Sequence, residues 1–153
     1  MAKRNWSLTI ANPLMKFILR SPLHKMASSQ IMLITVTGRK SGKKYTTPVN
    51  FVELDDFEED GLLSVVSHQH RTWWRNLRGG APVTIVLRGQ QREAHAEVIE
   101  DPAEVAELLY GHLLEVPQFA VPLGVGLDDA GVPIRADADT AAIGKVMVEV
   151  WQE

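Results

Sequence analysis

The sequence predicts a small antiparallel β-barrel with peripheral helices, a mainly β fold of the α+β class. Short apolar runs rich in β-branched residues recur between turn residues, which is typical of antiparallel strands. Residues 82–88 and 92–99 flank the turn Gly89-Gln90-Gln91 and indicate a hairpin. The chain shows no alternation of strands with helices and no GxGxxG sequence, which argues against a doubly wound dinucleotide-binding fold.

The expected elements can be placed by residue range. Residues 31–37 are apolar enough for a buried strand, whereas Pro48 places the next strand, 45–52, at a sheet edge or a bulge. Asp101-Pro102 starts a helix, and Glu104 completes the pattern of a capping box. The remaining expectations are an acidic turn at 55–61, strands at 62–67, 82–88, 92–99 and 145–151, a short helix at 72–77 capped by Thr72, a buried helix face of Ala103, Ala106, Leu109, Tyr110 and Leu113, and a long loop or lid at 115–140.

Length and composition are those of one globular domain, which we expect to span residues 1–153. Hydrophobic residues make up 45% and charged residues 23% of the chain, which excludes intrinsic disorder. The absence of cysteine excludes disulfides, thiolate metal sites and cysteine nucleophiles. No apolar run reaches the roughly 18 residues that span a bilayer, and the first residues lack the apolar core of a signal peptide. We therefore expect a cytoplasmic protein.

The charges are distributed unevenly along the chain, although the net charge is only −3. Residues 1–50 contain nine Lys or Arg and no Asp or Glu, whereas residues 93–153 contain two basic and thirteen acidic residues. A first third without carboxylates produces positive potential where it folds together, so we expect an anionic partner. We expect no nucleic acid, because no recognised nucleic-acid-binding module accompanies the charge.

The N-terminal segment, residues 1–28, is expected to be helical and amphipathic. Apolar residues recur at spacings of three and four over residues 6–27, with Lys16, Arg20 and Lys25 between them. Two placements stay open for this segment. We favour packing over the barrel, and the alternative is a weak contact with the inner face of a membrane.

The segment Thr37-Gly38-Arg39-Lys40-Ser41-Gly42-Lys43-Lys44 carries the clearest functional signal. Two glycines let the backbone turn tightly, and four cations with a hydroxyl surround them. Such a loop offers N–H groups and positive charge to a phosphate. It is not an ATP-binding P-loop, because the GxxxxGK[ST] spacing is missing. The alternative is a solvated hairpin turn whose lysines protect a sheet edge.

A second signal lies in Ser67-His68-Gln69-His70-Arg71-Thr72-Trp73-Trp74-Arg75-Asn76-Leu77. Indole rings can form the wall of a site for a planar ligand, and Asn76 or Arg75 can hydrogen-bond its edge. We expect one indole in the core and the other at the ligand. No metal site is expected at the two histidines, because neither a carboxylate nor a third imidazole lies close in sequence. No Ser/His/Asp set is evident, so an enzyme of this sequence would use a bound cofactor.

These two segments together resemble the deazaflavin-dependent nitroreductase family. The first match is Thr37-Gly38-Arg39-Lys40-Ser41-Gly42 followed by Thr46-Thr47-Pro48-Val49. The second is Trp73-Trp74-Arg75-Asn76-Leu77 followed by Pro82-Val83. The resemblance runs over roughly residues 12–110 and, in weaker form, to Trp151. It implies a split β-barrel of the FMN-binding type.

The resemblance also implies an oxidoreductase that binds the deazaflavin coenzyme F420. Reduced F420 would transfer a hydride to a small organic acceptor such as a nitroaromatic, a quinone or an activated double bond. Family members use tyrosines in the C-terminal part of the chain, and here none follows Tyr110. The candidate catalytic proton donors are therefore His68, His70 and Tyr110. The implied cofactor-binding residues are Arg39, Lys40, Ser41 and Gly42 at the phosphate and acidic tail, Thr47, Pro48 and Val49 along the ring, and Ser67, His70, Trp74 and Asn76 around the rest of the pocket.

Two other functions stay open beside this one. The same fold can bind flavin mononucleotide (FMN), whose single phosphate would occupy the basic loop. The second alternative is a non-catalytic protein that carries or senses a cofactor or a hydrophobic ligand. It stays open because the C-terminal tyrosine is missing. A homodimer is expected by analogy with other split barrels.

Overall fold

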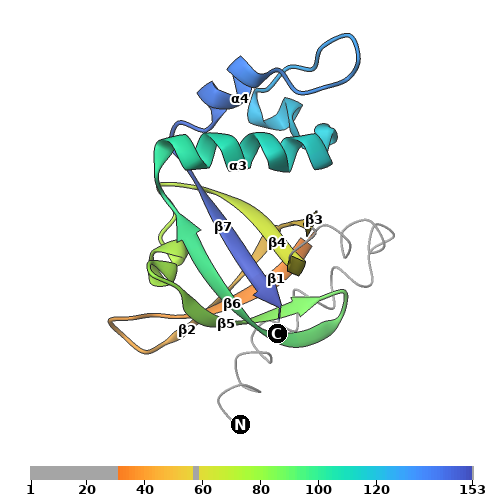
Figure 1. Cartoon of the computed structure of the whole chain (residues 1–153). Coiled ribbons are helices and arrows are strands. Elements are labelled where there is room, and N and C mark those ends of the chain that lie inside the picture. Colours follow the sequence, from red (N-terminus) through yellow and green to blue (C-terminus); the bar gives the residue numbers. More distant parts are fainter. Residues whose placement is uncertain (1–30, 57–58, 153) are drawn as a thin grey trace.

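The computed structural model describes residues 31–56 and 59–152, so the expected helical segment 1–28 and its membrane contact lie outside the described residues. One curled antiparallel sheet of seven strands dominates the fold, in the order β2-β1-β5-β6-β7-β4-β3 (Figure 1). The strands are β1 (Ile31–Thr37), β2 (Lys44–Asn50), β3 (Val52–Asp56), β4 (Glu59–His68), β5 (Ala81–Leu87), β6 (Gln90–Ile99) and β7 (Lys145–Gln152).

The first strands follow the expected positions, with two corrections. β1 is the predicted buried strand, and Pro48 lies in the edge strand β2, the kind of strand in which proline is tolerated. The expected strand 45–52 is divided at Phe51, whose side chain is buried in the core, and its last residue begins β3. The expected acidic turn 55–61 is shorter, because β3 extends to Asp56 and β4 begins at Glu59.

The hairpin of β5 and β6 is confirmed, with a tighter turn than expected. Leu87 pairs with Gln90, so the connection is the dipeptide Arg88-Gly89 rather than Gly89-Gln90-Gln91. Both turn residues have positive φ angles, 49° and 80°. That backbone matches the twist of two-residue hairpins, which explains why glycine stands at one of the two positions.

Every second residue along the strands points to the inside of the curled sheet, and these side chains form the main core. Val146, Val148 and Val150 of β7 point inward as the alternation predicts, and Met147 points to the opposite face. One turn of 3-10 helix, η1 (Trp73–Leu77), closes an end of the barrel by burying Trp74 and Leu77. The predicted cap at Thr72 is wrong in detail, because its side chain makes no capping hydrogen bond.

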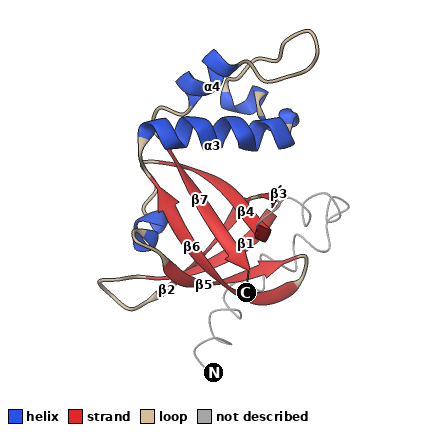
Figure 2. Cartoon of the chain, in the orientation of Figure 1, coloured by secondary structure: helices blue, strands red, loops and turns tan. Residues whose placement is uncertain are grey.

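A helical layer covers the outer face of β4 and β7 (Figure 2). Its long helix α3 (Pro102–Glu115) begins as predicted, and the Asp101 carboxylate accepts a hydrogen bond of 3.1 Å from the Glu104 N–H. Its buried face differs from the expectation: Leu109 and Leu113 are buried as predicted, Ala106 and Tyr110 are half-buried, and Ala103 is exposed. The other two buried positions of the helix are Val105 and His112.

Residues 115–140 are not a long loop or lid. They contain the 3-10 turns η2 (Pro117–Phe119) and η3 (Val121–Leu123) and most of the helix α4 (Arg135–Ala141). Ala120, Val125 and Ala138 are buried against α3 and Met147 in a second apolar cluster. Spaced small and apolar residues among the prolines and glycines allowed this packing, which composition alone does not reveal.

The Asp101 cap supplies a direct test of how α3 is stabilised. Asp101→Ala removes the acceptor for an otherwise unpaired helix N–H and should lower the free energy of unfolding by about 1 kcal/mol. Asp101→Asn keeps an acceptor oxygen and should cost less than half of that. Urea denaturation of the two variants measures the difference, and equal losses would contradict a capping role.

Candidate functional site

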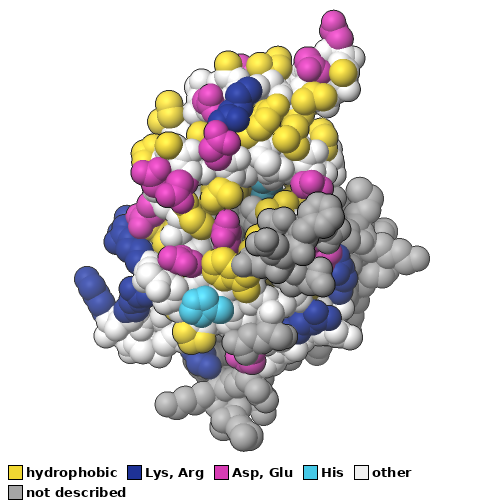
Figure 3. Space-filling model, in the orientation of Figure 1, with side chains coloured by type: hydrophobic (Ala, Val, Ile, Leu, Met, Phe, Trp, Pro, Cys, Tyr) yellow, Lys and Arg dark blue, Asp and Glu magenta, His cyan; other side chains and the backbone are white. Residues whose placement is uncertain are grey.

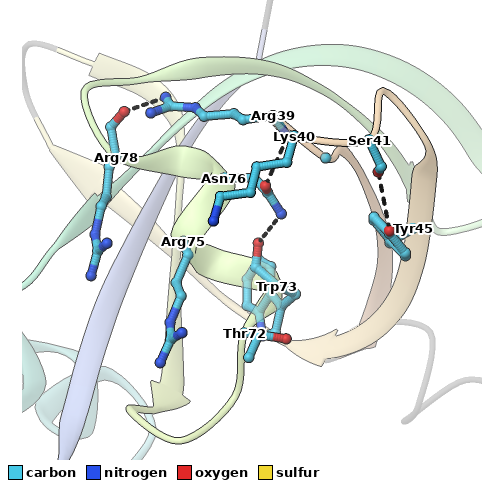
Figure 4. Close-up of a pocket in the computed structure, with 10 residues that line it drawn as sticks. Arg39, Lys40, Ser41, Tyr45, Thr72, Trp73, Arg75, Asn76 and Arg78 are labelled. Carbon is cyan, nitrogen blue, oxygen red and sulfur yellow. Dashed lines mark hydrogen bonds between the residues drawn. The ribbon is translucent and has the colours of Figure 1, made fainter.

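A cavity of about 650 Å³ lies between the β1–β2 loop, residues 38–43, and η1 (Figure 4). We call it the cation cavity, because four of its described lining residues are Lys or Arg and none is Asp or Glu. In Figure 3 several Lys and Arg side chains lie at the left edge, where Figure 1 places the β1–β2 loop, and others are scattered over this face, as are Asp and Glu. The lining residues are Gly38, Arg39, Lys40, Ser41, Tyr45, Thr72, Trp73, Arg75, Asn76 and Arg78.

The β1–β2 loop is held in shape by its own backbone. The Gly38 N–H donates to the Lys43 carbonyl at 2.7 Å, and the Gly42 N–H donates to the Gly38 carbonyl at 2.8 Å. Gly42 has a φ of 70°, and a Cβ on Gly38 would lie 2.8 Å from the Ser41 hydroxyl. The two glycines are therefore required by the turn itself.

Asn76 fastens this loop to η1. Its side-chain oxygen accepts a hydrogen bond of 3.1 Å from the Arg39 N–H, and its side-chain nitrogen donates to the Trp73 carbonyl at 3.1 Å. The Arg39 guanidinium crosses to the Arg78 carbonyl and makes a longer contact of 3.5 Å with the Gly80 carbonyl. The loop and η1 thus form one connected unit, as Figure 4 shows.

Trp74 makes cation–π contacts with two of the four cations of the cation cavity. The guanidinium groups of Arg75 and Arg78 lie 5.7 and 5.3 Å from its ring centroid, within cation–π range. Arg78 also forms a salt bridge of 2.9 Å with Glu100, which lowers the pKa of the Glu100 carboxyl and raises the pKa of Arg78 through the shared hydrogen bonds. This pair is largely exposed, so its main effect is on position rather than stability.

One tryptophan lies in the core and the other lines a cavity, as expected. The residue predicted at the cofactor, however, is the one in the core. Trp74 was expected among the cofactor-binding residues, yet only 3% of it is exposed and its indole N–H donates to the His68 carbonyl at 3.1 Å. Trp73 is half-buried and lines the cation cavity. Adjacent residues on one helical turn face different sides, and sequence alone does not show which side meets the core.

A second cavity of about 270 Å³ lies where β4, β7, α3 and the η2–η3 turns meet. We call it the mouth cavity. It shares a wall with the cation cavity, because the Trp73 indole N–H donates at 3.2 Å to the hydroxyl of Ser67, which lines the mouth cavity. Its lining residues are Asn50, Val66, Ser67, His68, His112, Phe119, Pro122, Leu123 and Lys145.

His112 is a residue of this cavity that sequence reasoning missed. Its ring is 4% exposed, and Nδ1 lies 3.0 Å from the hydroxyl of buried Ser64 on β4. Burial lowers the pKa of His112 from 6.5 to about 4, so the ring is neutral at pH 7. The only available signal was its spacing of three from Leu109 on the buried face of α3.

The other predicted residues are not all brought together. Arg39, Lys40, Ser41 and Asn76 line the cation cavity, and Ser67 and His68 line the mouth cavity. The remaining predicted residues line neither cavity: Gly42, Thr47, Pro48, Val49, His70, Trp74 and Tyr110.

The three candidate proton donors lie in different places. His68 and His70 stack with ring centroids 5.2 Å apart, and burial together with the Lys145 charge lowers the pKa of His68. Tyr110 lies on α3 with the Arg135 guanidinium 4.9 Å from its ring. Of the three, only His68 lines the mouth cavity, so the positions of His70 and Tyr110 do not support donation there.

A half-barrel with a cationic cavity beside a tryptophan is compatible with a flat, anionic cofactor. Residues 21–124 match the family of F420H(2)-dependent quinone reductases. The chain belongs to this family of oxidoreductases, whose reductant is the reduced deazaflavin F420. The predicted use of a deazaflavin is confirmed, while a nitro group as the acceptor stays a prediction. The chain has no match among curated proteins.

Solved structures resemble the chain at the level of the fold. A proposed pyridoxamine 5′-phosphate oxidase from Listeria innocua is 10% identical, with a TM-score of 0.50 and coverage of 94% of each chain. A protein of unknown function from Agrobacterium tumefaciens is 15% identical, with a TM-score of 0.48, and the match covers 87% of this chain but 55% of that one. An F420-H2-dependent reductase is 18% identical, with a TM-score of 0.46 and coverage of 78% and 93%. The expected split β-barrel is confirmed.

The cation cavity fits the cofactor that the family uses. F420 carries a phosphate and an oligoglutamate tail, both anionic. No carboxylate lines the described cavity, and Arg39, Lys40 and Arg75 offer it positive charge beside Arg78, which is paired with Glu100; such a tail requires positive charge. In the described ranges, 31–56 and 59–152, no group of three metal-ligating side chains occurs, and no helix there is long and apolar enough to cross a membrane.

Acid should destabilise the protein through His112. Its pKa is about 4 in the folded chain against an ordinary 6.5, so between these values the unfolded chain binds more protons and stability falls as the pH drops. The loss by pH 4 is on the order of 3 kcal/mol, because each tenfold difference in proton affinity between the two states corresponds to about 1.4 kcal/mol. His112→Gln removes the titrating group, so its free energy of unfolding should change less over this range. Urea denaturation across the range tests this, and parallel pH curves for the two proteins would contradict it.

Proposed function

We propose that this protein transfers a hydride from reduced F420 to a small organic acceptor. The observation that carries the proposal is the cation cavity, in which four cations lie beside the half-buried ring of Trp73 and only Arg78 forms a salt bridge with a described carboxylate, that of Glu100. When bound, the cofactor supplies the hydride. The protein binds, orients and shields the reacting ring. Holding the two reactants in the correct geometry lowers the barrier to hydride transfer.

Each part of the cation cavity has a role in this proposal. Lys40 and Arg75, which form no salt bridge with a described carboxylate, attract the phosphate and tail. Asn76 and the Arg39 guanidinium hold the loop against η1, so the cations are positioned before the ligand arrives. Such preorganisation reduces the entropy lost on binding.

The wall shared by the two cavities gives the cofactor ring a place. Trp73 lines the cation cavity, and through its indole N–H it fixes the Ser67 hydroxyl at the mouth cavity. A planar ring anchored by its tail in the first cavity would lie along Trp73 and present a face toward the second. Thr47, Pro48 and Val49 of β2 stay candidates for the far side of the ring, on the same hairpin as the loop.

Two lysines of one loop provide a matched test of the cation cavity. Lys40 lines the cavity and Lys43 does not, so Lys40→Gln and Lys43→Gln change the net charge equally at different places. We expect Lys40→Gln to weaken F420 binding about tenfold, as expected for a charge-assisted hydrogen bond, and Lys43→Gln to weaken it less than about threefold. Titration followed by tryptophan fluorescence measures both, and equal effects would contradict the assignment.

FMN is the parallel ligand in the same titration. FMN has one phosphate and no acidic tail, so we expect weaker binding than that of F420. Tight binding of FMN without binding of F420 would keep the fold and change the cofactor. Binding of neither would favour the carrier of another ligand.

Three finer expectations belong to the same proposal. The acceptor is a quinone, as the family's name indicates, with a nitroaromatic or an activated double bond as alternatives. The protein forms a homodimer, which size-exclusion chromatography with light scattering tests. It acts in the cytoplasm, with a membrane-surface contact through residues 6–27 as the alternative.

A further inference from the structure

The mouth cavity has the composition of a small-molecule site, and the cofactor binding proposed above places the tail in the cation cavity instead. Val66, Phe119, Pro122 and Leu123 form an apolar wall. Ser67, His68, His112, Asn50 and Lys145 bring polar groups to the same space. An apolar pocket with a few convergent polar groups is typical of ligand sites, and about 270 Å³ is at the small end of their range. It suits a molecule of one or two rings.

The charged and titratable residues of the mouth cavity indicate which kind of molecule it can bind. Its described lining contains no carboxylate, and Lys145 is its only residue with a permanent charge. The Lys145 ammonium is fixed by a hydrogen bond of 3.0 Å to the Ala141 carbonyl, at the end of α4. The two imidazoles favour the neutral form, because burial lowers the pKa of each. One cation without a counter-charge suits a neutral molecule that becomes anionic when it accepts a hydride.

His112 is placed to recognise such a molecule. Nδ1 lies 3.0 Å from the Ser64 hydroxyl, and this contact orients the ring where it lines the cavity, on the buried face of α3. When the Ser64 hydroxyl donates to Nδ1, the proton of the neutral ring lies on Nε2, which can donate a hydrogen bond to a carbonyl oxygen without first losing side-chain freedom. Phe119, Pro122 and Leu123 of η2 and η3 line the same cavity.

We propose that the mouth cavity is the acceptor site, that it takes a flat, uncharged acceptor of one or two rings with a conjugated carbonyl, and that His112 determines specificity by hydrogen-bonding that carbonyl. This inference rests on the proposed function. The acceptor receives a hydride and a proton, both lost by reduced F420 on oxidation, so a quinone leaves as a hydroquinone. Lys145 stabilises the anion formed between the two transfers.

The first test blocks the mouth cavity with a larger side chain. Leu123 lines it, whereas Leu127 is 39% exposed and lies outside it, so Leu123→Trp and Leu127→Trp form a matched pair. We expect Leu123→Trp to raise the KM for 1,4-naphthoquinone at least tenfold and to leave the Kd of F420 within twofold. Leu127→Trp should change neither. An unchanged KM in Leu123→Trp would overturn the proposal, as would a loss of F420 binding in a folded protein, because the cavity would then hold the cofactor ring.

A second variant covers the case in which Leu123→Trp does not fold. Phe119→Leu enlarges the cavity conservatively, so the affinity for the three-ring 9,10-phenanthrenequinone should rise relative to that for 1,4-naphthoquinone. An unchanged ratio would overturn the proposal. Calorimetric binding of both quinones to the cofactor-free protein gives this ratio without any turnover. Failure of F420 binding by the natural sequence would contradict the proposed function and leave this quinone measurement intact.

The role of His112 has its own readout. His112→Phe keeps a planar ring and removes the hydrogen bond, so binding of 1,4-naphthoquinone should weaken about fivefold to tenfold. Binding of naphthalene, which has the same rings without carbonyls, should stay within twofold. Equal losses for the two ligands would indicate a structural role only and would overturn the assignment of specificity to His112.

Discussion

The burial of Trp74 and Leu77 in one end of the barrel is the constraint on which the site depends. These two side chains fix η1, and η1 in turn places Trp73, Asn76 and the flanking arginines. Asn76 then holds the β1–β2 loop, so the cations of the loop and those of η1 face one space. The packing of Trp74 and Leu77 thus determines where the cations lie. Because like charges repel one another, they stay close together only where packing holds their backbone in place.

The fold was largely predictable, because its signals are local. Strand alternation in β7 and the capping residue of α3 specify their own structure whatever lies around them. The region after α3 was not predictable from composition. Its prolines and glycines resemble a loop, but Ala120, Val125 and Ala138 bury against α3, and this burial depends on contacts between distant parts of the chain.

The candidate site was predictable in part, for a similar reason. A glycine-rich basic loop is a local feature, and Arg39, Lys40, Ser41 and Asn76 do meet in one cavity. The choice between Trp73 and Trp74 depends on which face of a single helical turn meets the barrel, and that is set by tertiary packing. His112 was missed because a lone histidine on a buried helix face has no partner in sequence, while its contact with Ser64 spans 48 positions.

The most direct measurement compares the affinity of the natural protein for F420 with its affinity for the same deazaflavin lacking the phosphate and glutamate tail. If the cation cavity binds the tail, F420 should bind at least about a hundredfold more tightly at low salt, and the difference should narrow as salt screens the charges. Equal affinities at every salt concentration would contradict the account, because the convergent cations would then have no role in cofactor binding.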